Sequence, residues 1–162
     1  MAVLAAGTPA PEFSLARFDG GTLTNADLDG AITVLVFYPS AFSGVCTDQF
    51  ELYKSELAGF TGMGATLYGV STDSHYSAEA FRTQLQVDIE LVADFEPKGE
   101  VARAFGVYWE PAGTANRALV VLGSAGTVAW SWEGEHPGTL PGPELVREGI
   151  EAAQGSQPVP TA

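Results

Sequence analysis

The sequence has few of the residues that build disulfides and metal sites, and each shortage excludes a class of protein. Its 162 residues include one cysteine, Cys46, so no disulfide can form within the chain. That excludes a small secreted scaffold held together by disulfides. The two histidines, His75 and His136, show no ligand spacing with Cys46, so we expect neither a metal site nor a metal cofactor. We expect no other cofactor.

Positive charge is equally scarce. Seven Lys and Arg stand against twenty Asp and Glu, which gives a formal net charge of −13. Phosphate backbones and anionic membrane surfaces attract clusters of Lys and Arg, and the sequence contains no such cluster. We therefore expect no nucleic acid and no membrane as partners, and we interpret the acidity as a well-solvated surface.

Long apolar runs are also missing, since no stretch approaches the ~20 residues that span a bilayer. The first residues lack the basic region of a signal peptide, so we expect a cytoplasmic protein. Apolar residues nevertheless make up 46% of the chain, enough for a substantial core. Without repeats or a long linker, we expect one domain over residues 1–155 and a disordered, Pro-rich tail over 156–162.

Strands and helices alternate along the chain in the predicted order. Apolar, β-rich runs predict two buried strands and a closing hairpin, and short strands are expected near the N-terminus. Phe50, Tyr53, Leu57 and Phe60 recur at helical spacing, with Cys46 one turn earlier on the same stripe. We expect an α/β fold: a thioredoxin-like mixed sheet flanked by helices, with extra N-terminal strands. The expected strands are 13–16, 21–24, 33–38, 65–71, 89–93, 117–122 and 127–132, and the later helices are 77–86 (with Ser77 as its cap), 100–105 and 143–154.

Cys46 lies at the start of a predicted helix, just after a buried strand that Pro39 ends. Free backbone N–H groups and the helix dipole favour an anion at this position, so a thiolate is stabilised there. A lone cysteine is more often an inert core residue. Its placement alone leaves these two interpretations open.

Arg117 opens the apolar run RALVVL, where a guanidinium is costly unless an anion pairs with it. The charged head could instead reach solvent at the strand end, or pair with one of the many carboxylates. In a thioredoxin-like fold the strand after Arg117 lies beside the strand that leads to Cys46. A thiolate–guanidinium pair is therefore available to this sequence.

Several segments together resemble the peroxiredoxin family. Pro39, Ser43 and Cys46 fit the pattern P-x-x-x-[ST]-x-x-C in a strand-to-helix context. The opening GTPAPEFSL is similar to the family's N-terminal segment, and GVYWEPAGTANR is similar to the stretch that carries its active-site arginine. The resemblance covers about residues 5–150 and is greatest to one-cysteine peroxiredoxins of the alkyl hydroperoxide reductase E type.

The resemblance implies a role for each matching residue. Cys46 would attack one peroxide oxygen and become a sulfenic acid. Ser43 would hydrogen-bond the thiolate and the peroxide, although a loop cap explains it equally well. Pro39 would shield the pocket from water, or simply end the strand. Arg117 would stabilise the thiolate and the leaving oxygen, and Gln49 would orient Arg117 or else be an exposed helix residue.

One departure from many relatives determines how the cycle closes. Some relatives place a second cysteine five residues after the first, where this chain has Glu51. An external thiol, or a thioredoxin- or glutaredoxin-like protein, must therefore reduce the sulfenic acid. The expected function is a thiol-dependent peroxidase for hydrogen peroxide and organic hydroperoxides. A peroxide sensor that relays oxidation to a partner, and a non-catalytic binding module, are the alternatives.

The resemblance also allows a homodimer, since relatives often pair across the edge near the active site. Four aromatic residues are candidates for its apolar contacts, although core packing or pocket lining explains them as well: Phe42, Tyr76, Tyr108 and Trp109.

Overall fold

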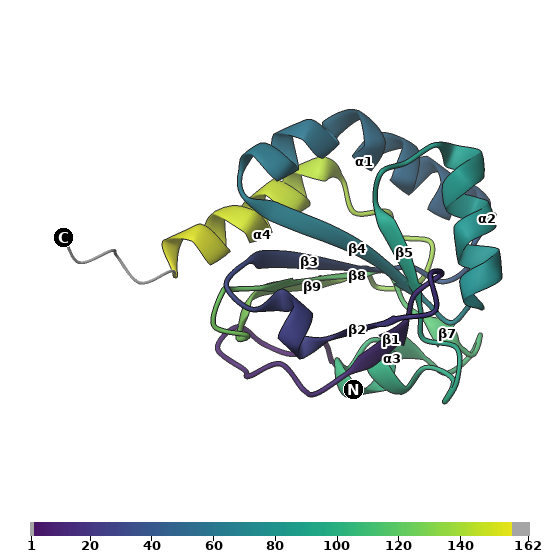
Figure 1. The fold of residues 1–162 in the computed structure, drawn as a ribbon, viewed down its shortest axis with the longest axis horizontal. Helices are drawn as coiled ribbons and strands as arrows, with labels where there is room; N and C mark the ends of the chain where they lie inside the picture. The colour runs from purple at the N-terminus through teal and green to yellow at the C-terminus, as the bar shows by residue number, and fades with distance from the viewer. Residues whose placement is uncertain (1, 157–162) are drawn as a thin grey trace.

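The computed structural model describes residues 2–156, which are built around one mixed sheet (Figure 1). Its seven strands lie in the order β2-β1-β5-β4-β3-β8-β9. The strands are β1 (Ser14–Ala16), β2 (Thr22–Thr24), β3 (Ile32–Phe37), β4 (Ala65–Ser71), β5 (Glu90–Ala93), β8 (Ala118–Leu122) and β9 (Val128–Glu133). A second, two-stranded sheet joins β6 (Tyr108–Trp109) to β7 (Thr114–Ala115). The helices are α1 (Gly44–Gly62), α2 (His75–Leu85), α3 (Glu100–Ala104) and α4 (Pro143–Gly155), with a 3₁₀ turn over Asn25–Leu28.

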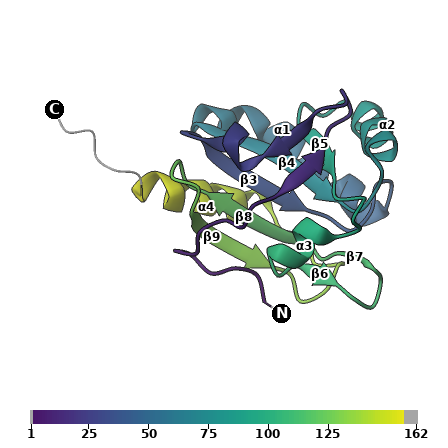
Figure 2. The ribbon, with the colours of Figure 1, turned by 60° about the horizontal axis from the view of Figure 1, so that its bottom comes forward.

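Strand β3 is an interior strand of the sheet, and this position accounts for its apolar sequence. It pairs parallel with β4 and antiparallel with β8, and all six of its residues are buried. Successive side chains point to opposite faces. Val34 and Val36 pack with α1, α2 and α4, whereas Leu35 and Phe37 pack with α3 and the N-terminal strands. Figure 2 shows α1 and α2 on one side of the sheet, and α3 with the small sheet on the other.

The predicted elements correspond to observed ones, with corrections at several ends. Helix α2 begins at His75, and its cap is Ser74 rather than Ser77. Ser74 has the extended backbone of a cap, and its Oγ accepts the N–H of Ser77 at 3.3 Å. Strand β8 begins one residue after Arg117, and α4 includes Gly155. The 3₁₀ turn and the pair β6–β7 were not expected.

At the C-terminus, only part of the expected tail falls within the described residues. Ser156 caps α4, and its backbone N–H donates to the carbonyl of Ala152 at 3.2 Å. The prediction of disorder for 157–162 lies outside the described residues. Among residues 2–156, no helix combines the length and the apolar character needed to cross a membrane.

Candidate active site

The connection from β3 to α1 places Cys46 in the first turn of a helix. After Pro39 the chain turns sharply at Phe42, whose φ of 66° is left-handed and costly for a bulky residue. This turn sets Ser43 as the N-cap of α1, and Ser43 Oγ accepts the backbone N–H of Cys46 at 3.3 Å. Cys46 is the third residue of the helix and has no exposed surface. The predicted strand–thiol–helix arrangement is therefore present.

A carboxylate that follows the neighbouring strand, β4, holds this connection in place. Asp73 follows β4, and its Oδ2 accepts the backbone N–H of Ala41 and the hydroxyl of Ser71, both at 2.8 Å. Because β4 pairs with β3, these bonds tie the loop before Cys46 to the sheet. Nothing in the sequence distinguishes Asp73 from the other acidic residues.

The pairing of β3 with β8 brings Arg117 to the thiol. Phe37 is opposite Ala118 in this antiparallel pair, so Arg117 lies level with the residue where the chain leaves β3. The Arg117 side chain is directed inward and only 2% of the residue is exposed. Its Nη2 donates to Cys46 Sγ at 3.1 Å. The interpretation that the guanidinium snorkels to solvent is therefore wrong.

The other nitrogen atoms of Arg117 are also bonded. Nη1 donates to Gln49 Oε1 at 2.8 Å, and Nε donates to the carbonyl of Pro137 at 2.5 Å. Gln49 is fully buried, so the exposed helix position considered for it is not what the structure contains. Gln49 Nε2 in turn donates to Tyr53 Oη at 3.3 Å. Tyr53 and the Pro137 carbonyl are members of the site that the sequence did not indicate.

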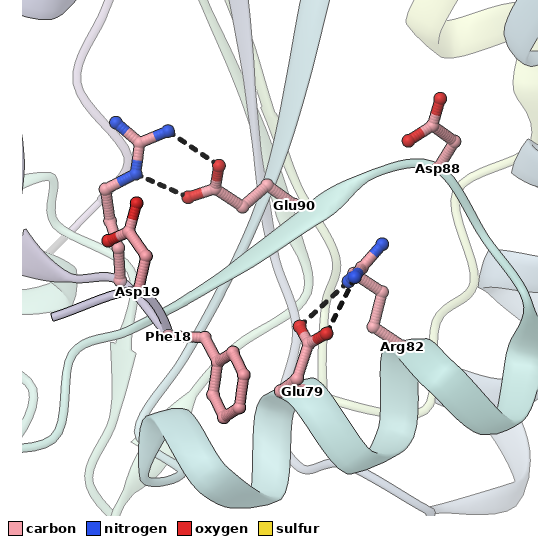
Figure 3. A pocket seen from close by; sticks show the side chains of 7 residues that line it. Phe18, Asp19, Glu79, Arg82, Asp88 and Glu90 are labelled. Atoms are coloured by element: carbon pink, nitrogen blue, oxygen red, sulfur yellow. Dashed lines mark hydrogen bonds and ion pairs between the residues drawn. The ribbon is translucent and has the colours of Figure 1, made fainter. Parts of the chain in front are cut away.

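Arg117 differs from every other arginine in its choice of partner. Arg17 pairs with Glu90 at 2.7 Å. Arg82 pairs with Glu79 of the same helix, α2, also at 2.7 Å, and both pairs line a hollow beside this helix (Figure 3). The two remaining pairs are Arg103–Glu110 and Arg147–Glu56. Among the described residues, which include all five arginines, only Arg117 pairs with no carboxylate. A buried cation is costly without an anion beside it, and the sulfur of Cys46 occupies the place that a carboxylate takes beside the other arginines.

The predicted site residues thus fall into two groups. Cys46, Arg117 and Gln49 are directly joined by hydrogen bonds, whereas Ser43 contacts Cys46 through the backbone. Pro39 is half-buried at the start of the loop. Within residues 2–156, no three His, Cys, Asp or Glu side chains gather in a way that could hold a metal ion.

The site thus consists of a buried thiol at a helix start, bonded to a buried arginine, on a thioredoxin-like sheet. The chain belongs to the AhpC/TSA family, whose model matches residues 6–131. It is 30% identical over 151 residues to alkyl hydroperoxide reductase E of Mycobacterium tuberculosis, covering 93% of this chain and 98% of that one. Alkyl hydroperoxide reductase C of Amphibacillus xylanus is 31% identical over 128 residues, covering 75% of this chain and 68% of that one.

Solved structures agree with this assignment. The AhpC of Enterococcus faecalis is similar with a TM-score of 0.84 at 26% identity, covering 98% of this chain and 100% of that one. Peroxidoxin BcpB of Mycobacterium tuberculosis is similar in fold, with a TM-score of 0.79 at 21% identity and coverages of 96% and 99%. The thioredoxin-like fold and the resemblance to alkyl hydroperoxide reductase E are both confirmed.

Proposed function

We propose that Cys46 and Arg117 carry out the thiol-dependent peroxidase reaction of this peroxiredoxin. The observation that carries the proposal is the 3.1 Å hydrogen bond from Arg117 Nη2 to Cys46 Sγ. A buried guanidinium without a carboxylate partner favours the thiolate, which is the nucleophilic form of cysteine. The helix start acts in the same direction, because its free N–H groups favour an anion.

The first step forms one bond and breaks one. The Cys46 thiolate attacks the terminal oxygen of a hydroperoxide, so an S–O bond forms and the O–O bond breaks. The sulfur is oxidised by two electrons to a sulfenic acid. The other half of the peroxide leaves as an alkoxide or hydroxide, which takes up a proton. Arg117 donates hydrogen bonds that stabilise the negative charge as it moves from the sulfur to the leaving oxygen.

Ser43 and Pro39 shape the approach to the sulfur in this proposal. Ser43 Oγ accepts the N–H of Cys46 and keeps its own O–H for another acceptor, the role we assign to a peroxide oxygen. Pro39 has no N–H and limits water at the entrance. Because Cys46 has no exposed surface, the side chains around it must move to admit the substrate. We assign hydrogen peroxide and organic hydroperoxides as substrates, and the names of the alkyl hydroperoxide reductase relatives support the organic ones.

An external thiol completes the cycle, since the chain has one cysteine. The first thiol condenses with the sulfenic acid to give a mixed disulfide and water, and a second thiol releases Cys46 and an oxidised disulfide. A thioredoxin- or glutaredoxin-like protein, or a small thiol, can supply both. A reducing cytoplasm is the compartment that suits this requirement.

A homodimer through the aromatic surface beside the loop is also part of the proposal. Phe42 is 51% exposed and Tyr76 is 71% exposed, which is unusual for such large side chains. Phe18 packs edge-on against Tyr76 at 6.3 Å between ring centroids and extends this surface. Tyr108 and Trp109 are half-buried in the small sheet and are therefore weaker candidates. Replacing Tyr76 with Glu should shift the sedimentation profile of a dimer toward the monomer.

A peroxide-consumption assay with excess dithiothreitol tests the function directly. The parent protein should consume hydrogen peroxide and an alkyl hydroperoxide catalytically, and Cys46→Ser should abolish both reactions. Catalytic consumption by the Cys46→Ser protein, or none by the parent, would overturn the proposal.

A further inference from the structure

A continuous chain of hydrogen bonds leads away from the thiol and ends on a backbone carbonyl. Cys46 Sγ accepts from Arg117, and Arg117 donates to Gln49 Oε1. Gln49 Nε2 donates to Tyr53 Oη, and the Tyr53 hydroxyl donates to the carbonyl of Pro141 at 2.9 Å. Cys46, Gln49 and Tyr53 follow one another at helical spacing on the buried face of α1. One helix therefore supplies most of the residues in this series of hydrogen bonds.

The bond from Tyr53 to Pro141 determines which group donates and which accepts in the other hydrogen bonds. A carbonyl can only accept, so the Tyr53 hydroxyl must donate to Pro141. The Tyr53 oxygen is then left as an acceptor, and the amide nitrogen of Gln49 is the donor that faces it. The amide oxygen of Gln49 is thereby presented to Arg117, which carries only donors.

Burial keeps the hydrogen bonds of Gln49 and Tyr53 in a single arrangement. Gln49 and Tyr53 have no exposed surface, so no solvent competes for their polar atoms. Burial raises the pKa of Tyr53, which the bond from Gln49 partly offsets, so the hydroxyl stays protonated at neutral pH. A buried amide without an acceptor is strongly disfavoured, so Gln49 depends on Tyr53 to remain beside Arg117.

We propose that Tyr53 is a positioning residue for the peroxidase reaction. It acts through Gln49, whose amide it holds so that Gln49 Oε1 fixes the guanidinium of Arg117 on the Cys46 sulfur. The inference rests on the proposed function for its rate effect, and on the hydrogen bonds alone for its geometry.

The Gln49→Glu substitution distinguishes a positioning role of Tyr53 from ordinary core packing. When position 49 is Gln, the Tyr53→Phe substitution leaves amide N–H donors of Gln49 unpaired in a site without water. The Gln49 side chain is then more stable in a position away from Arg117. With Gln49→Glu, position 49 has no donor to satisfy, and either carboxylate oxygen can accept from Arg117. The carboxylate therefore needs no hydroxyl at position 53 to face the guanidinium.

The experiment is a double-mutant cycle with two readouts. Peroxide reduction and the alkylation of Cys46 by iodoacetamide are measured at neutral pH for the parent, Tyr53→Phe, Gln49→Glu and the double variant. In the parent background, Tyr53→Phe should slow both reactions on the order of tenfold, the scale of one disrupted buried hydrogen bond. In the Gln49→Glu background, the same substitution should change both rates by less than about twofold, the scale of a lost bond that leaves no donor unpaired.

Tyr38→Phe provides a matched control. Tyr38 is as fully buried as Tyr53 and belongs to the same core cluster, but its hydroxyl has no hydrogen-bond partner among the described residues. This variant should keep both rates. Equal losses from Tyr53→Phe in the two backgrounds would overturn the inference, since they would indicate a packing effect. A parent that reacts with iodoacetamide but not with peroxide would refute the proposed function, while the alkylation arm would still test Tyr53.

Discussion

Arg117 Nη2 lies 3.1 Å from Cys46 Sγ, although the two residues are 71 positions apart in the sequence. The antiparallel register of β3 and β8 accounts for this contact, because Arg117 and the loop toward Cys46 leave the sheet at the same end. The chain offers many carboxylates, and the four other arginines use them. Arg117 is the one arginine whose charge is directed at the thiol.

Replacing Arg117 with Ala should slow peroxide reduction about a hundredfold, the usual effect of removing one donor from a developing negative charge. Stopped-flow kinetics at several peroxide concentrations would measure the second-order rate constant. Arg103→Ala is the control, because it removes the same charge from an exposed pair with Glu110. Equal rate constants for the Arg117→Ala protein and the parent would contradict the assignment.

Ser43→Ala should lower both the stability and the rate. It removes the N-cap of α1, which costs about 1 kcal/mol, and it removes the hydroxyl assigned to the peroxide. Ser74→Ala removes the equivalent cap of α2, whose hydroxyl is bonded to Ser77 rather than to Cys46, and should lower stability alone. Urea unfolding and peroxide kinetics on the two variants separate these effects. A similar loss of rate in both variants would mean that Ser43 acts only as a cap.

The fold and the central pair could be predicted because their signals are local. An apolar strand, a proline and a helical stripe mark the connection to Cys46, and the fold class then brings the strand after Arg117 beside it. Tyr53 could not be singled out, because a tyrosine on an apolar stripe is typical of core packing. The Pro137 carbonyl carries no side-chain signal at all. The cap of α2 was misplaced because Ser74 and Ser77 are equally good caps, and only the backbone distinguishes them.

The two buried tyrosines should make the protein lose stability at alkaline pH. Burial raises the pKa of Tyr38 and of Tyr53, so above about pH 10 the unfolded chain releases these protons before the folded one does. The unfolded state then binds fewer protons, and the free energy of unfolding falls as the pH rises, by about 1.4 kcal/mol per unit for each tyrosine. Urea unfolding between about pH 9 and about pH 11.5, a range that spans the ordinary tyrosine pKa, should show this decline, and Tyr38→Phe should make it less steep. An unchanged slope in that variant would contradict the prediction.

The oxidised protein should carry its oxygen on Cys46 rather than in a disulfide. After one equivalent of peroxide, intact mass should rise by about one oxygen, and excess peroxide should add a second as the sulfinic acid. Two chains could join only through Cys46 itself, and a disulfide requires Cα atoms within roughly 7 Å. The absence of exposed surface on Cys46 and its position in the first turn of α1 oppose that approach. A non-reducing gel should therefore show no linked dimer, and dithiothreitol should return the singly oxidised protein to its starting mass. Rapid, stoichiometric dimer formation at low peroxide would show instead that Cys46 serves as its own resolving thiol.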